Sequence, residues 1–237
     1  MDTNKGIPKK ITPDCLVDSI VEFVIKTDYK DEFIEHIVCD SIKDAYPDDE
    51  FRTYPMTGKY EGKHFLANDK FRVFVCSSLI SINIVSQYPG WNVLNRFIKD
   101  ALQGLYNQEK PVVDFMQVRI KYVSKFPNIS IFEVWDGDPI KLNQIPPFLG
   151  REFSFKFSIL SREKQLLAEA DVKLNDQLPL VDGKGVYSRI YVALQAVKGD
   201  GNWSIVYEQL QMLHENEKVV FFRLLSKEFV EKLNPEW

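Results

Sequence analysis

Apolar and polar residues alternate along several segments, with the period of two that is typical of half-buried β-strands. The clearest alternation lies in two neighbouring segments, whose apolar faces carry Phe153, Phe155, Phe157 and Ile159, then Leu166, Ala168, Ala170, Val172 and Leu174. Similar patterns elsewhere predict strands over 16–26, 51–56, 71–76, 79–86, 113–125, 129–135 and 186–194. We expect a hairpin turn at Ser77 and Ser78, and a polar loop over 58–68.

Other segments repeat their apolar residues three and four positions apart, which indicates amphipathic helices. This spacing predicts helices over 29–46, from Trp91 towards Pro111, and over 203–225. Gly90 precedes the second helix and permits a backbone angle that a side chain would resist. Ser226 is a helix-capping residue type, so we expect it to start a last helix through Leu233.

The order of these elements indicates an α+β fold of largely antiparallel sheets with helices on one face. After an N-terminal arm over 1–14, residues 15–110 read as strand, helix, three strands and helix. Residues 111–237 repeat a similar order and finish on a long C-terminal helix. Short connections favour hairpins over parallel crossovers. We therefore predict two similarly ordered halves packed against each other.

Composition places the chain among ordinary globular proteins. Of its 237 residues, 45% are hydrophobic and 27% are charged, and the net charge of −4 disfavours nucleic acid as a partner. Cys15, Cys39 and Cys76 form no CxxC pair, which is typical of a reduced, cytoplasmic protein. The N-terminal sequence lacks the apolar core of a signal peptide, and no apolar run is long enough to span a membrane.

Motifs that commit a protein to one chemistry are missing from the sequence. It contains no GxxxxGK[ST], GxGxxG, HExxH or GxSxG pattern, so we expect no cofactor. The three histidines are far apart in sequence, and we expect no metal site. The remaining catalytic candidates are His64, in the predicted polar loop, and the strand residues Glu169, Asp171 and Lys173. A solvated strand face with cross-strand charge pairs explains the last three equally well.

Residues of two segments are candidates for binding. Arg119, Lys121 and Lys125 alternate along one predicted strand, with Tyr122 and Phe126 between them. This arrangement indicates either a basic and aromatic surface for a nucleotide or an acidic partner, or a plain exposed strand face. On the long C-terminal helix, His214 and Phe222 are further candidates. Apolar residues there spread beyond one stripe, at Met212, Val219 and Phe222, which predicts a contact with the other half or with a second copy.

Several short segments, in order, carry a resemblance to a known family. They are the strand 16–26 with its following helix, Tyr88-Pro89-Gly90-Trp91, the stretch from Gln117 to Ser124, Leu213-His214, Phe221-Phe222 and Ser226. Together they resemble a sporadically distributed, uncharacterised bacterial protein family of about this length. The resemblance implies a setting in defence or toxin–antitoxin neighbourhoods. The chain departs from the family at Lys121-Tyr122-Val123-Ser124, where the family has Arg-Tyr-Ile-Asn, so Ser124 replaces an amide.

These observations favour a cytoplasmic binding protein, within a mobile bacterial defence or toxin–antitoxin module. We expect a protein partner or a second copy of the chain, with a small ligand as another occupant. The alternative is a metal-dependent nuclease or nucleotide-processing enzyme that uses Glu169, Asp171 and Lys173, or His64. Convergence of these acids in a concave site would favour the enzyme.

Overall fold

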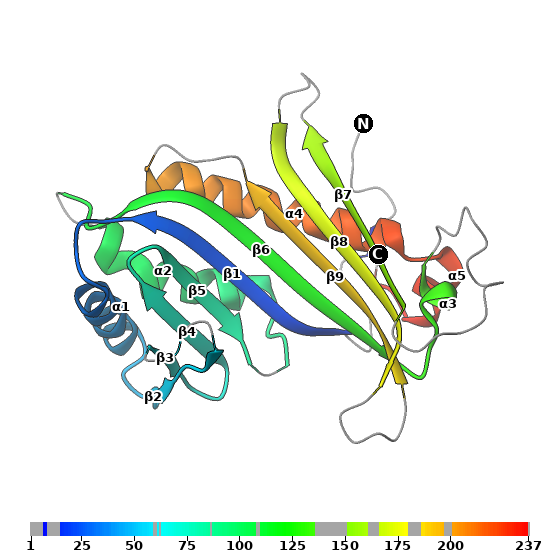
Figure 1. Cartoon of the computed structure of the whole chain (residues 1–237), viewed down its shortest axis with the longest axis horizontal. Helices are drawn as coiled ribbons and strands as arrows, with labels where there is room; N and C mark the ends of the chain where they lie inside the picture. Colours follow the sequence, from blue (N-terminus) through cyan, green and yellow to red (C-terminus); the bar gives the residue numbers. More distant parts are fainter. Residues whose placement is uncertain are drawn as a thin grey trace. The chain divides into compact units, whose positions relative to one another are not determined.

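The fold combines helices with antiparallel strands, which confirms the α+β class (Figure 1). It is seen in a computed structural model that describes residues 7–8, 15–58, 61, 63–85, 87–107, 110–135, 151–160, 166–179, 186–196 and 201–236. Most of the predicted N-terminal arm over 1–14 lies outside the described residues.

The strands and helices follow the order expected from the sequence with few changes. The strands are β1 (Leu16–Lys26), β2 (Arg52–Pro55), β3 (His64–Ala67), β4 (Phe71–Cys76), β5 (Leu79–Ile84), β6 (Asp114–Pro127), β7 (Arg151–Leu160), β8 (Leu166–Pro179) and β9 (Val186–Ala196). The helices are α1 (Asp31–Ala45), α2 (Trp91–Tyr106), α3 (Ile131–Val134), α4 (Trp203–Leu224) and α5 (Lys227–Lys232). The predicted cap of α5 is confirmed, because the Ser226 side chain accepts a hydrogen bond from the Phe229 N–H.

The described strands form one sheet in the order β2-β3-β4-β5-β1-β6-β9-β8-β7. The pairs β2–β3, β3–β4, β4–β5, β1–β5 and β7–β8 are all antiparallel. β4 and β5 form the predicted hairpin, in which Cys76 is opposite Leu79 across the turn at Ser77 and Ser78.

The chain forms two compact units that interleave along the sequence. Unit 1 comprises Met1–Val17, Lys121–Leu194 and Met212–Trp237, and unit 2 comprises Asp18–Ile120 and Gln195–Gln211. The order of elements in the sequence predicted two consecutive halves instead. The difference arises because β6, β9 and α4 each belong partly to one unit and partly to the other.

The core of unit 2 lies between its strands and the helices α1 and α2. Residues with apolar side chains on one face of β1 are opposite those of β5, as in the pairs Val21–Ile82 and Phe23–Ile80. The ring of Phe97 on α2 stacks on Phe71 of β4, with centroids 3.9 Å apart. Gly90 has a φ of +93° directly before α2, which confirms the expected glycine conformation.

The core of unit 1 uses the alternating faces of β6, β8 and β9. The inward side chains of β8 are Ala168, Ala170, Val172 and Leu174, all at most 2% exposed. From the helices, Leu213 of α4 and Phe229 of α5 are also buried in this unit. Buried Asp176 fixes the start of α3, because its Oδ1 accepts hydrogen bonds from the Ile131 N–H and the hydroxyls of Ser130 and Ser188.

Two local predictions were wrong. The segment 129–135, predicted as a strand, contains the helical turn α3, which is stabilised by a capping box between Ser130 and Glu133. His64 is not in a loop but begins β3, where it is opposite Pro55 of β2. Both segments are short, and their apolar pattern does not separate a strand from a helical turn or a loop.

Candidate binding site

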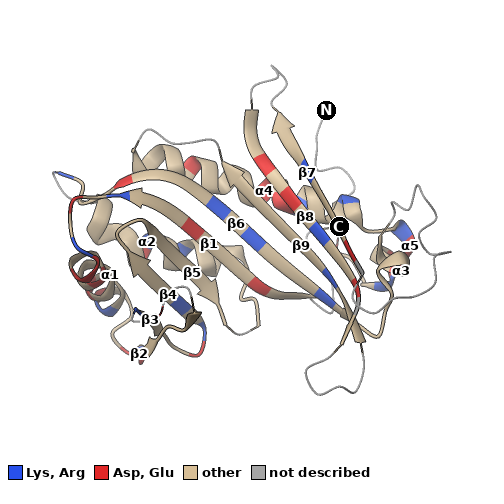
Figure 2. Cartoon of the chain, in the orientation of Figure 1, with Lys and Arg blue, Asp and Glu red and all other residues tan. Residues whose placement is uncertain are grey.

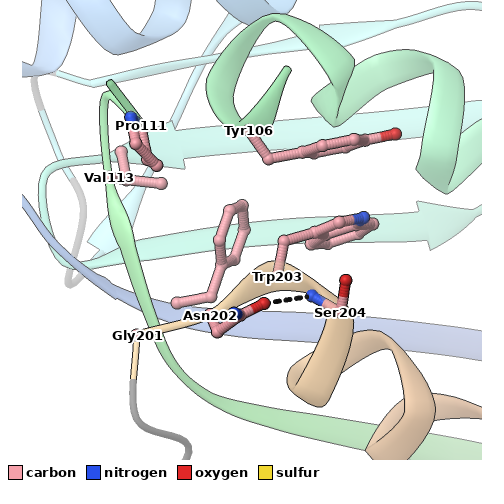
Figure 3. Close-up of a pocket in the computed structure, with 8 residues that line it drawn as sticks. Tyr106, Pro111, Val113, Gly201, Asn202, Trp203 and Ser204 are labelled. Atoms are coloured by element: carbon pink, nitrogen blue, oxygen red, sulfur yellow. Dashed lines mark hydrogen bonds between the residues drawn. The ribbon is translucent and has the colours of Figure 1, made fainter. Parts of the chain in front are cut away.

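An aromatic-lined cavity of about 410 Å³ lies in unit 2, where α2 ends and α4 begins (Figure 3). Its described lining consists of Tyr106, Pro111, Val113, Phe115, Gly201, Asn202, Trp203 and Ser204. The volume falls within the range of small-molecule sites, which is about 300–1,000 Å³. The cavity is therefore the candidate binding site.

Three segments hold the cavity walls together. Tyr106 is the last residue of α2, and Phe115 is in β6 next to the segment before α4. The Phe115 N–H donates to the Gly201 carbonyl at 3.1 Å, which joins β6 to this segment. Gly201 has a φ of +96°, a backbone conformation that residues with a side chain rarely adopt. A glycine is therefore needed for the chain to turn into α4 at this wall.

The start of α4 is ordered by Asn202. Its side-chain oxygen accepts a hydrogen bond from the Ser204 N–H at 2.8 Å, as Figure 3 shows, and its backbone carbonyl accepts one from Val206. This is the usual arrangement of a helix N-cap. The cap fixes Trp203, the first residue of α4, in the cavity wall.

Trp203 is the centre of an aromatic cluster that forms the apolar wall. Its ring stacks on Tyr106, with centroids 4.4 Å apart and an interplanar angle of 7°. It also contacts Phe115 at 4.9 Å and Phe23 of β1 at 5.8 Å. Figure 3 shows the parallel rings of Tyr106 and Trp203 on one side, with Pro111 and Val113 across from them. Each of these rings therefore packs against at least one other ring of the cluster.

The described lining contains no histidine, cysteine, acidic or basic side chain. Tyr106 is its titratable residue, and burial raises the pKa of the Tyr106 hydroxyl, with smaller contributions from Asp100 and Tyr207. The hydroxyl also donates to the Lys99 carbonyl at 3.3 Å. Tyr106 is therefore protonated at neutral pH and is no general base.

The predicted catalytic residues do not converge in the described structure. Glu169, Asp171 and Lys173 follow one another along one face of β8 in unit 1, and Asp171 forms an ion pair with Lys156 of β7 at 3.7 Å. His64 is exposed on β3 in unit 2. Across the described residues, no group of three or more His, Cys, Asp or Glu side chains is arranged to hold a metal ion. Cross-strand charge pairing explains the β8 residues.

The prediction that basic and aromatic side chains of β6 share one surface was wrong. Tyr122 and Phe126 are buried, 4% and 2% exposed, whereas Lys121 and Lys125 belong to the opposite face of the strand. Side chains alternate along a strand, so residues one position apart cannot share a face. Arg119 in unit 2 forms an ion pair with Glu22 of β1 at 3.9 Å.

Tyr122 and His214, both predicted to bind, contact each other in unit 1. The Tyr122 hydroxyl lies 3.2 Å from Nδ1 of His214 on α4. Burial, and then the charge of Lys218, lowers the pKa of His214 to about 4, so the imidazole is neutral at pH 7. The contact is therefore part of the packing of α4 on β6.

Sequence reasoning missed Glu217, which is 7% exposed on the buried face of α4. Burial raises its pKa to about 8, against the opposite effect of Lys218. The sequence did indicate that Glu217 is buried, because it lies four residues after Leu213 and four before Phe221, inside the apolar stripe of the helix. Phe222, another predicted binding residue, is half-buried and packs on Phe221, with centroids 5.2 Å apart. Met212 and Val219 are also half-buried.

The chain was compared with known proteins. No protein-family model matches it, and no curated protein is similar to it. Within the described residues, no helix has both the length and the apolar composition that crossing a bilayer requires.

Proposed function

We propose that this chain is a non-catalytic binding protein that takes up a small molecule with a flat, apolar ring. The observation that carries the proposal is the cavity lined by Trp203, Tyr106 and Phe115. Aromatic side chains bind flat rings through offset stacking and edge contacts. Asn202 and Ser204 provide polar groups at the rim for the orientation of a ligand.

The absence of charge in the described lining supports binding over catalysis. Nucleophilic or acid–base catalysis needs a titratable group whose pKa suits its task. Tyr106 stays protonated, and the described wall has no second titratable group. The positions of Glu169 and Asp171 do not favour the alternative of a metal-dependent nuclease, because the two residues follow one another along one strand face and Asp171 forms an ion pair with Lys156.

The sequence resemblance supports a biological setting for this binding. We propose that the protein works in a mobile bacterial defence or toxin–antitoxin module, in which a small ligand or a protein partner is recognised. Cys15, Cys39 and Cys76 form no disulfide with one another, which suits a reducing compartment.

The test uses 8-anilinonaphthalene-1-sulfonate (ANS), a fluorescent probe with a flat ring, in titrations with the 237-residue chain. Ser204 is exposed at the rim, so a Ser204→Trp variant should fill the cavity without removing a buried group. We expect this variant to weaken probe binding about tenfold or more. Glu208→Trp adds the same ring to the exposed face of the same helix and is the matched control.

The two variants separate the cavity from non-specific apolar binding. Equal probe affinity for Ser204→Trp and the wild type, with both folded by thermal melting, would contradict the proposal. Failure of the folded wild-type chain to bind the probe would contradict it as well. The control should bind as the wild type does, since residue 208 is outside the cavity lining.

A further inference from the structure

The sheet face of unit 1 opposite the helices carries basic and aromatic side chains from three adjacent strands. Lys121 and Lys125 are on β6, Tyr187, Arg189 and Tyr191 on β9, and Lys173 on β8. Figure 2 shows the basic bands on these strands. We propose that this surface, called the β6–β9–β8 face, binds single-stranded nucleic acid.

Burial and side-chain contacts assign these residues to one face. Along β9, Ser188, Ile190 and Val192 are buried and alternate with half-buried Tyr187, Arg189 and Tyr191. The Lys125 ammonium lies 5.0 Å from the centre of the Tyr187 ring, which places β6 and β9 side chains together. Arg189 contacts Asn175 of β8, two residues beyond Lys173.

The opposite face of unit 1 is the one that packs on helices. Tyr122 of β6 contacts His214 of α4, and Phe126 contacts Phe229 of α5 at 5.3 Å between ring centroids. Trp135, directly after α3, packs on Phe153 of β7 at 6.3 Å. The described helices of unit 1 therefore cover the sheet face opposite the β6–β9–β8 face.

Arg189 is held in a fixed position at the centre of this face. Its Nε and Nη2 donate to Oδ1 of Asn175 at 3.1 and 2.8 Å. Asn175 in turn donates from Nδ2 to Glu152 of β7 at 2.9 Å. An arginine fixed by two hydrogen bonds loses little side-chain entropy when it contacts a phosphate. The carboxylate of Glu152 acts on Asn175 and does not pair directly with the guanidinium in these contacts.

Tyr187 and Tyr191 flank Arg189 at two-residue intervals on the same strand face. A strand rises about 3.3 Å per residue, so the two tyrosines are roughly 13 Å apart along β9. That separation lets each ring stack on a different base, while Arg189 lies between them. Single-strand binding proteins combine such stacking platforms with a positively charged surface.

The balance of charge on the β6–β9–β8 face favours an anion. Lys121, Lys125, Lys173 and Arg189 are basic, and the acidic residues lie towards one end of β8 and on β7. Of these, Asp171 is paired with Lys156. The net charge of −4 disfavours nucleic acid for the chain as a whole, but counterion release depends on the local basic face. An acidic peptide would satisfy the lysines and would leave the two tyrosines without a role, so nucleic acid is the better match.

The experiment measures fluorescence anisotropy of a labelled oligothymidylate of about 15 nucleotides with the full chain. We expect binding at about 50 mM salt, with a slope of log affinity against log salt near −3 for about four neutralised phosphates. Arg189→Gln should weaken binding about tenfold and make this slope shallower by roughly 0.7. Tyr187→Leu should weaken binding about tenfold but keep the slope, because stacking releases no counterions.

Two variants outside β9 test the proposal even if a β9 variant does not fold. Lys125 is exposed on the same face, and Lys125→Ala should also make the slope shallower. Lys43→Ala, on the exposed face of α1 in unit 2, should change neither the affinity nor the slope. Lack of binding by the folded wild type would overturn the proposal. So would displacement of the oligonucleotide by an equal concentration of polyglutamate, with affinity unchanged by Tyr187→Leu, which would assign an acidic peptide to this face.

Discussion

The hydroxyl of Tyr122 lies 3.2 Å from Nδ1 of His214, which joins β6 to α4 inside unit 1. The two rings meet nearly edge to face, at 6.3 Å and 61°. Tyr122 can donate to Nδ1 only while this nitrogen carries no proton. Burial, and then the charge of Lys218 on the same helix, favour the neutral imidazole. The contact therefore makes the packing of α4 sensitive to acid.

The lowered pKa of His214 predicts that the folded protein loses stability in acid. Its pKa is about 4 in the folded protein and 6.5 for an unperturbed histidine, so the unfolded chain binds more protons between these values. The contribution of His214 is complete above pH 6.5 and is lost as the pH falls towards 4. His214→Gln should remove about 1–3 kcal/mol of this acid dependence, measured by urea unfolding at several pH values.

The control for His214 is His36 on α1, whose side chain is 73% exposed. His36→Gln should leave the pH dependence of the unfolding free energy as in the wild type. A His214→Gln variant whose stability falls between pH 6.5 and 4 as steeply as that of the wild type would contradict the assignment.

The raised pKa of Glu217 predicts that the folded protein loses stability as the pH rises. Its pKa is about 8 in the folded protein against 4.5 for the unperturbed group, so the folded chain binds more protons between these values. Its contribution is complete below pH 4.5 and is lost as the pH rises to 8. Glu217→Gln keeps the shape without the charge and should be more stable than the wild type by about 2–4 kcal/mol at pH 8.

The measurement for Glu217 is the midpoint of urea unfolding from pH 4 to 8. The advantage of Glu217→Gln should vanish near pH 4, where the carboxyl is neutral in both states. Glu208→Gln on the exposed face of α4 is the matched control and should follow the wild type. The prediction would be contradicted if Glu217→Gln were less stable than the wild type at pH 8. That result would show that other groups stabilise the buried carboxylate.

The close packing of α1 and α2 at Gly104 predicts that a larger residue at this position destabilises the chain. A Cβ at this position would lie 2.6 Å from Oγ of Ser41 and 2.7 Å from Cγ2 of Ile37. The Gly104 N–H also donates to Oγ of Ser41 at 3.2 Å. Gly104→Ala should therefore destabilise the chain by about 1–3 kcal/mol, although alanine is the better helix former by about 1 kcal/mol.

Thermal melting tests the Gly104 prediction through a double variant. Ile37→Ala removes the nearest methyl group, so adding it to Gly104→Ala should cost less than Ile37→Ala costs alone. Strictly additive effects of the two substitutions, or a melting temperature for Gly104→Ala at or above that of the wild type, would contradict the close packing of these helices.

The long alternating and helical patterns were enough to predict most of the elements. The strand 16–26 was predicted with the bounds that β1 has, and the helix from Trp203 was predicted as α4. The patterns failed in short segments, at β3 and α3, because four residues contain too little of either period. In α3 the side chains of Ser130 and Glu133 decide the helical turn, a capping signal that was present in the sequence.

The candidate cavity could not be predicted from the sequence. Tyr106 and Trp203 are 97 positions apart, and the pairing of Phe115 with Gly201 helps to bring their segments together. The basic residues of β6 were recognised, but their aromatic neighbours were assigned to Tyr122 and Phe126 of the same strand. Tyr187 takes this place instead, because β9 lies beside β6 in the sheet.

The sequence by itself determined the α+β class, most of the strands and helices, and the caps at Gly90 and Ser226. These depend on interactions between residues close in the chain, whose period and conformational preferences are local. Only the tertiary structure decided how β6, β9 and α4 are shared between the units, and which side chains meet at Trp203 and Arg189. Those contacts depend on strand order and on burial, which join residues that the chain itself keeps far apart.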